Sequence, residues 1–283
     1  MVYFGRTDLA SEAGRRCLGQ QDSCGNIPGL RVQEHREGTC SVCSVEIETQ
    51  EAAHRVGKPM GHYVTLEYSD VYPESFPVTA RLMARLLKLF LPSPLPDCVC
   101  IATLGNPDIT PDAIGPLTAS QILVTRHLKQ SRDPLFSQYC STALCRAGVL
   151  GLTGLESANQ ISAFCREVRA KLVIAVDALA GSDSTLLCRS IQICDSGISP
   201  GSGVGNDRQA LSRESLGLPV IAIGAPTVLD ASNLSRDSRL ERLFVTPRSI
   251  DSDVRFAAKT IAYGINLALQ PHLRLEEINS LIG

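Results

Sequence analysis

The stretch CVCIATLGNPDITPDAIGP, residues 98–116, decides the fold of this chain. Its first seven residues are almost all apolar, which is typical of a strand buried on both faces of a sheet. Residues 105–116 are rich in Gly and Pro and therefore indicate a turn, and a helical pattern over 117–129 follows. In open α/β sheets, ligands bind beyond the carboxyl ends of the strands. We therefore expect functional residues in this turn.

Similar apolar runs recur along the chain, and helical patterns separate them. Two more buried strands are expected, KLVIAVDAL at 171–179 and LPVIAIG at 218–224. Alternating residues predict shorter strands at 41–49, 63–68 and 190–194. Helices are expected at 77–90, 157–169, 254–269 and 276–282, a glycine-punctuated loop at 142–153, and a loop with a helix at 226–233. We predict an α/β fold with a largely parallel or mixed sheet and helices on both faces.

The bulk composition is that of an ordinary globular chain. Of 283 residues, 44% are hydrophobic and 20% are charged, and the net charge is −2. A nearly neutral chain gives no sign of binding nucleic acid or an anionic membrane surface. The sequence has no apolar run long enough to span a bilayer, and the N-terminus lacks the apolar core of a signal peptide. We therefore expect a cytoplasmic protein without a direct nucleic-acid or membrane partner.

The 11 cysteines are an odd number and are spread through apolar segments. In a cytoplasmic protein such residues are mostly reduced thiols that fill the core. Cys40 and Cys43 form a lone CxxC motif. A zinc site needs a second ligand pair at a suitable spacing, and none is evident. We expect this thiol pair to lie in an N-terminal loop, and we predict no metal.

Two aspartates are the strongest candidates for chemistry. Asp112 follows the first buried strand, and Asp177 interrupts the apolar run at 171–179. If the two strands are parallel neighbours, both carboxylates lie at one mouth of the sheet. Close carboxylates tend to share one proton, and such a pair can activate water and protonate a leaving amine, as in peptide hydrolysis. The plainer interpretation of Asp112 is a favourable acid in the first turn of a helix. Asp108, in the same turn, is a candidate for positioning substrate.

The glycine-rich loop at 197–206 allows two interpretations. The sequence GISPGSGVGN matches neither GxxxxGK[ST] nor a correctly placed GxGxxG, so a functional flap fits better than a nucleotide cradle. Gly201, Gly203 and Gly205 are then candidates for positioning substrate. The alternative is a non-enzymatic α/β module that binds a small ligand through this loop.

Eight stretches together resemble the germination protease (spore protease) family of endospore-forming bacteria. They span nearly the whole chain in the family's order: RTDLASEA (6–13), GKPMGHYVTLEYS (57–69), GNPDITPDAIGP and VTRHL (105–128), AGVLGLTGLE (147–156), VIAVDALA (173–180), IQICDSGISPGSGVGNDR (191–208), LPVIAIGAPTVLDA (218–231) and VTPRSID (245–251). The resemblance implies an endopeptidase that degrades small acid-soluble spore proteins during germination, with a fold similar to that of the hydrogenase maturation proteases. Two aspartates proposed to be catalytic in the family match Asp112 and Asp177.

The resemblance also gives the N-terminus a role. It implies an inactive precursor that shortens itself, a homotetramer, no cofactor, and a place in the forespore or spore core. The family's substrates carry a site such as Thr-Glu-Phe-Ala-Ser-Glu, cut after the first Glu, and residues 7–12, TDLASE, look like a copy of it. We therefore expect cleavage between Asp8 and Leu9, a propeptide at 1–8, and one peptidase domain at 9–283. A metal-dependent variant of the hydrolase, with Asp112 and Asp177 as ligands, is a further alternative.

Overall fold

The computed structural model describes residues 7–19, 27–131, 133–201, 208–234, 240 and 243–282. In this part of the chain the strands form one nine-stranded sheet. They are β1 (Leu30–Glu37), β2 (Cys40–Ile47), β3 (Gly61–Tyr68), β4 (Val99–Thr103), β5 (Thr142–Arg146), β6 (Leu172–Gly181), β7 (Ser190–Cys194), β8 (Val220–Asp230) and β9 (Phe244–Val245).

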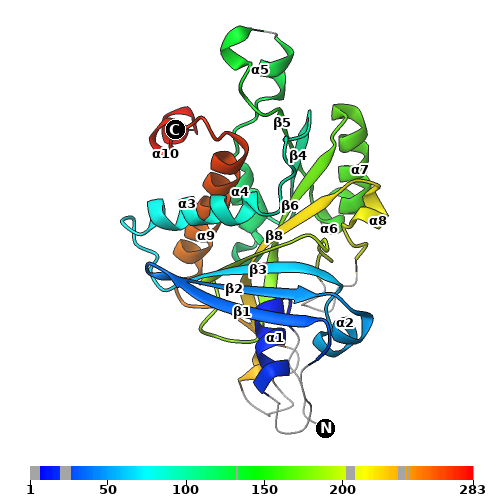
Figure 1. Cartoon of the computed structure of the whole chain (residues 1–283), viewed down its shortest axis with the longest axis vertical. Helices are drawn as coiled ribbons and strands as arrows, with labels where there is room; N and C mark the ends of the chain where they lie inside the picture. The colour runs from blue at the N-terminus through cyan, green and yellow to red at the C-terminus, as the bar shows by residue number, and fades with distance from the viewer. Residues whose placement is uncertain are drawn as a thin grey trace.

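The helices of the described residues lie on both sides of this sheet (Figure 1). They are α1 (Ala10–Gly19), α2 (Gln50–Val56), α3 (Phe76–Lys88), α4 (Ile114–Ala119), α5 (Arg126–Gln130), α6 (Leu150–Thr153), α7 (Ser157–Val168), α8 (Arg213–Leu216), α9 (Ile250–Leu269) and α10 (Leu275–Ile282), with 3₁₀ turns η1 (Thr110–Asp112), η2 (Pro134–Phe136) and η4 (Ala231–Asn233). Among the described residues, no helix is both long enough and apolar enough to cross a membrane.

The strand order is β1-β2-β3-β7-β8-β6-β4-β5, with β9 paired to β8. The pairs β5–β4, β4–β6 and β6–β8 are parallel, whereas β7 and the strands beyond it pair antiparallel. The predicted α/β fold with a mixed sheet is therefore confirmed. Its antiparallel part is larger than a mixed edge, because β1, which the sequence did not predict, extends it.

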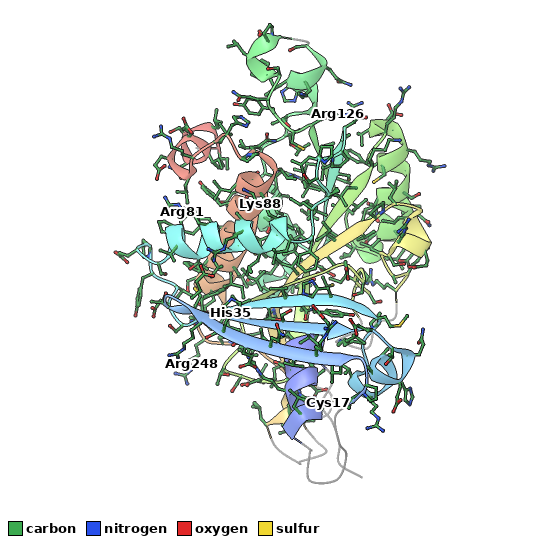
Figure 2. The ribbon with its side chains drawn as sticks, in the orientation of Figure 1. Cys17, His35, Arg81, Lys88, Arg126 and Arg248 are labelled. Carbon is green, nitrogen blue, oxygen red and sulfur yellow. The ribbon has the colours of Figure 1, made fainter. Side chains whose placement is uncertain are left out.

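The parallel strands are apolar on both faces because helices cover both. Along β4, Val99 and Ile101 belong to the core beneath α3 and α9, while Cys100 and Ala102 belong to the core beneath α7. On α3, the cations Arg81, Arg85 and Lys88 are exposed, as expected of a solvated face; Figure 2 labels two of them.

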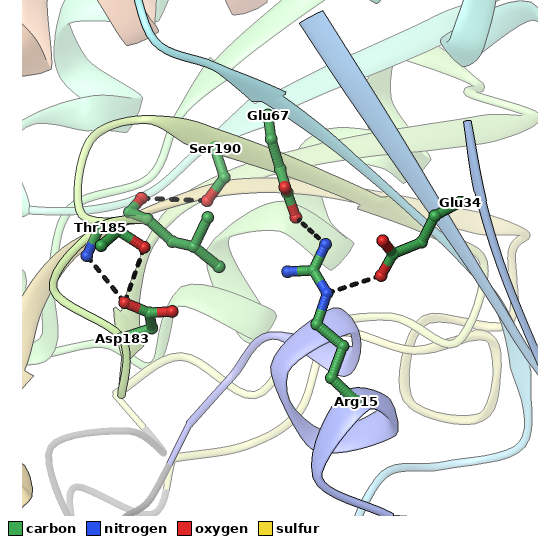
Figure 3. Close-up of polar contacts among 7 residues, drawn as sticks. Arg15, Glu34, Glu67, Asp183, Thr185 and Ser190 are labelled. Atoms are coloured by element: carbon green, nitrogen blue, oxygen red, sulfur yellow. Dashed lines mark hydrogen bonds and ion pairs between the residues drawn. The ribbon is translucent and has the colours of Figure 1, made fainter. Parts of the chain in front are cut away.

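Helix α1 packs on the antiparallel half of the sheet. Ala10 and Ala13 share a core with Val45 of β2. On the same helix, the Arg15 guanidinium lies between Glu34 of β1 and Glu67 of β3, with both N–O distances 2.7 Å (Figure 3). The N-terminal segment is therefore bound to the sheet by an apolar contact and by ion pairs.

Three predicted segments differ from the structure. The helix expected at 117–129 is two short helices, α4 and α5, because Leu123 and Thr125 turn their backbone N–H groups to Asn266 Oδ1 and the Thr142 carbonyl. The loop expected at 142–153 begins with β5, which pairs with β4. Most of the loop and helix expected at 226–233 is the end of β8, which carries Pro226 at an irregularity in its pairing with β6, and only Ala231–Asn233 are helical, as the 3₁₀ turn η4.

The CxxC motif also lies elsewhere than expected. Cys40 and Cys43 are both on β2, buried, and their thiols are free. A strand places residues three apart on opposite faces, so the two side chains belong to different cores. The expectation of a thiol pair in a loop is wrong, because strand pairing with β1 and β3 orders this segment.

Candidate active site

A cavity of about 320 Å³ opens at the carboxyl ends of β4 and β6, and both Asp112 and Asp177 line it. The register of the two strands explains this. Thr103, the last residue of β4, pairs with Val176, so Asp177 stands one residue beyond the end of β4. The chain then turns through 105–109 into η1, which brings Asp112 back to the same mouth of the sheet. The expected meeting of the two aspartates therefore follows from parallel pairing.

The turn is tight enough to require glycine at two positions. A Cβ at Gly105, whose φ is +114°, would lie 2.0 Å from the Asp112 carbonyl oxygen. A Cβ at Gly115 would lie 1.9 Å from the Leu104 carbonyl oxygen. Because both contacts are to backbone, neither can yield by a side-chain rotation. The two glycines let the turn fold closely onto the end of β4 and so fix the position of Asp112.

Asp177 is almost completely buried, with 4% of its surface exposed. Its Oδ1 accepts a hydrogen bond from the Ala178 N–H at 2.9 Å. Burial is the main cause that raises the pKa of Asp177 to about 8; the negative charge of Asp112 adds to the rise, and the Ala178 hydrogen bond opposes it. Asp177 therefore carries a proton at neutral pH.

Asp112 is only half-buried, so its ionised form loses less contact with water than that of Asp177. Its Oδ2 accepts from the Asn106 N–H at 2.7 Å. Partial burial raises the pKa of Asp112, while the Asn106 N–H and the Arg208 guanidinium act against that rise. Of the two acids, Asp112 is thus the one that more readily holds a negative charge.

The two carboxyl groups thus share one cavity but differ in burial. An ionised carboxylate can take a proton from water, and a protonated one can give a proton to an oxygen or a nitrogen. That division of labour is what amide hydrolysis needs. Among the described residues, no three His, Cys, Asp or Glu side chains are grouped to hold a metal ion.

The expected cleavage site lies against the same cavity. Asp8 lines it, and the charge of Asp8 contributes to the raised pKa of Asp177. Leu9 is fully buried in a small apolar cluster with Leu179 and Leu186. Asp8, the residue before the expected scissile bond, therefore shares a cavity with the two aspartates.

Of the other residues that the sequence suggested for positioning substrate, not all line the cavity. Gly201 lines the cavity. Gly203 and Gly205 lie outside the described residues. Asp108 is exposed and is not among the residues that line the cavity, because the turn directs it to solvent while the Asn106 Oδ1 accepts its backbone N–H. The proposed positioning role of Asp108 thus has no structural support.

Sequence reasoning missed three residues around the segment at 7–12. Arg208 lines the cavity with the two aspartates. Lys58 Nζ donates to the Thr7 carbonyl at 2.6 Å, and burial lowers the pKa of Lys58. Gln192 bonds to the backbone on both sides of Leu9. All three fall within the stretches that carry the family resemblance, but no local spacing indicates their roles.

Comparisons with known proteins show what the whole chain is similar to. The germination protease family model matches residues 7–240. The chain is 34% identical to the germination protease of Clostridium tetani, over 98% of this chain and 99% of that one. It is 35% identical to the germination protease of Caldanaerobacter subterraneus subsp. tengcongensis, over 98% of each. Among solved structures, the NiFe hydrogenase maturation protease HycI from Thermococcus kodakarensis KOD1 aligns with 60% of this chain and 92% of its own, at 20% identity and a TM-score of 0.33.

Proposed function

Because this chain belongs to the germination protease family, we propose that it is an endopeptidase that begins the degradation of small acid-soluble spore proteins during germination. Family membership makes the chain a protease. The observation that carries the aspartic-type mechanism is the shared cavity of Asp112 and Asp177, in which burial and the neighbouring charge keep Asp177 protonated.

In the proposed reaction, Asp112 accepts a proton from a water molecule as the water oxygen attacks the carbonyl carbon of the scissile bond. Asp177 gives its proton to the carbonyl oxygen. As the C–N bond breaks, the proton held on Asp112 passes to the leaving nitrogen, and Asp177 recovers its own proton as the carbonyl re-forms. Each acid ends in the state in which it began, so the pair turns over without a cofactor.

We further propose that the chain is made as a precursor that cuts itself between Asp8 and Leu9. Asp8 lies in the cavity of the two aspartates, which supports this site. Residues 1–8 are then the propeptide, and 9–283 form the peptidase domain. We also propose a homotetramer in the forespore or spore core, which sedimentation of the purified chain would test.

The decisive experiment replaces each aspartate with asparagine. Asp112→Asn and Asp177→Asn should each lower self-processing and the cleavage of a purified small acid-soluble spore protein by about 1,000-fold or more, because asparagine can neither take nor give the proton. Asp108→Asn in the same turn is the matched control and should keep nearly full activity. Sequencing of the new N-terminus should give Leu9.

Two results would count against the proposal. Full activity in both single variants would remove the pair from the mechanism. A chain that binds a small ligand tightly but cleaves neither itself nor the spore protein would instead favour the non-enzymatic module.

A further inference from the structure

Gln192 of β7 connects the sheet to the segment beside the aspartates. It is buried, with 6% of its surface exposed. Its Nε2 donates to the Asp8 carbonyl oxygen at 3.2 Å, and its Oε1 accepts from the Ala10 N–H at 2.7 Å. One neutral side chain therefore holds the backbone on both sides of Leu9. The carbonyl that it contacts belongs to the bond that we propose is cut.

Asp8 is fixed by two further bonds to the end of β6. The Asp8 N–H donates to the Ala180 carbonyl, and the Ala180 N–H donates to Asp8 Oδ2, both at 2.8 Å. On the preceding residue, Thr7, the carbonyl accepts from Lys58. The Asp8 carbonyl is thus presented to Gln192 by a segment that is held in place on either side.

The other end of the segment is fixed by Glu12, which is also buried. Its Oε2 accepts from the Ser182 N–H at 2.8 Å, and its Oε1 accepts from the Asp183 N–H at 3.1 Å. The receiving loop is itself ordered, since Asp183 Oδ1 accepts from the backbone and hydroxyl of Thr185 (Figure 3). Residues 8–12 are therefore held at three points, with Gln192 in the middle.

We propose that Gln192 is a catalytic residue whose Nε2–H group stabilises the partial negative charge that develops on the scissile carbonyl oxygen before the proton of Asp177 reaches it, an inference that rests on cleavage at Asp8–Leu9. A fixed donor aimed at that oxygen stabilises the transition state more than the ground state. A neutral amide suits the place, because a cation there would favour ionisation of Asp177 and remove the proton that the reaction needs.

The test is Gln192→Glu, which keeps the size of the side chain. When the introduced carboxyl group is ionised, it still accepts from the Ala10 N–H but has no hydrogen to give to the Asp8 carbonyl, whereas in its protonated form it can do both. At about pH 8 the rate of self-processing should fall by about 100-fold relative to the unsubstituted chain. Towards pH 5 the rate of the variant relative to that of the unsubstituted chain should rise by about tenfold or more, because the introduced carboxyl group takes up a proton.

Gln270→Glu is the matched control. Gln270 is also buried, and its amide likewise accepts from and donates to the backbone, at the N–H and carbonyl of Cys140, both at 2.9 Å. Unlike Gln192, which bonds to Asp8 and Ala10, Gln270 has its amide bonded to Cys140, away from the segment at 7–12. Its variant should lose as much thermal stability as Gln192→Glu yet process itself within about threefold of the unsubstituted chain at both pH values.

Equal rates in the two variants at pH 8, or a ratio for Gln192→Glu that does not change with pH, would overturn the role of Gln192. If Gln192→Glu does not fold, Gln192→Met replaces it: the expected result is then a loss that low pH does not restore, and normal processing overturns the role. A failure of the proposed function looks different, because the unsubstituted chain would then not release Leu9 at all.

Discussion

Asp177 and Glu12 are almost equally buried, with 4% and 5% of their surfaces exposed, yet their surroundings differ. In the described residues, Glu12 accepts hydrogen bonds from the Ser182 N–H, the Ser182 hydroxyl and the Asp183 N–H, whereas Asp177 accepts one, from the Ala178 N–H. Asp177 also faces another acid, Asp112. With several hydrogen-bond donors around it, the buried carboxyl group of Glu12 serves as an anchor. Asp177 has one donor and a like charge nearby, so its carboxyl group tends to hold a proton.

The largest effect on stability is expected from removing the ionisable group at position 177. The folded-state pKa of Asp177, about 8, lies above the unfolded value near 4, so between these values the folded chain binds more protons than the unfolded chain. Asp177 therefore costs the fold stability progressively as pH rises through that window, by roughly 1 kcal/mol per pH unit, and the cost is constant above it.

Asp177→Asn cannot ionise, so its free energy of unfolding should exceed that of the unsubstituted chain by an amount that grows from about pH 4 to about pH 8. Urea unfolding at several pH values measures this difference. A difference that stays constant across the window would mean that Asp177 is not held protonated by the fold.

A smaller effect on stability and on self-processing is expected at Glu12. Glu12→Gln replaces an acceptor of the Ser182 and Asp183 N–H groups by an amide, one end of which presents hydrogens to a donor. The free energy of unfolding should fall by about 1–3 kcal/mol. Self-processing should slow by about tenfold, because the segment that presents Asp8 is held less firmly.

Glu34→Gln is the control for Glu12→Gln. It weakens the ion pair of Arg15 with β1, which is exposed, and should cost at most about 1 kcal/mol and leave processing nearly unchanged. If both variants slow processing equally, then general loosening of α1, rather than the anchoring of Glu12, controls the rate.

Much of the parallel half of the sheet could be predicted from the sequence. The apolar runs around Ile101 and Ile174 are buried on both faces, and an acid within such a run stands out. The meeting of Asp112 with Asp177 then follows from adjacent parallel strands. β5 was not predicted because its five residues directly precede a glycine-rich stretch. The full length of β8 was not predicted because Pro226 is unusual within a strand.

The contacts of the N-terminal segment could not be predicted. Gln192 looks like any polar residue of an alternating strand, and its partner Asp8 lies 184 residues away. Ser182 and Asp183 contribute backbone N–H groups, which no residue pattern encodes. Long-range pairing decides these roles, so local sequence carries no signal for them.

The complete burial of Leu9 has a consequence for the chain once it is cut. In the intact chain the Leu9 backbone N–H donates to the Thr7 hydroxyl at 3.0 Å, and Thr7 would leave with the propeptide. Hydrolysis would turn that neutral N–H into a charged amine with its partner gone, inside an apolar cluster where an unpaired charge is costly. If the chain is cut there, we expect the new terminus to move out of the cluster. Amide hydrogens at the start of α1 should then exchange faster after processing, and unchanged protection would show that the terminus stays in place.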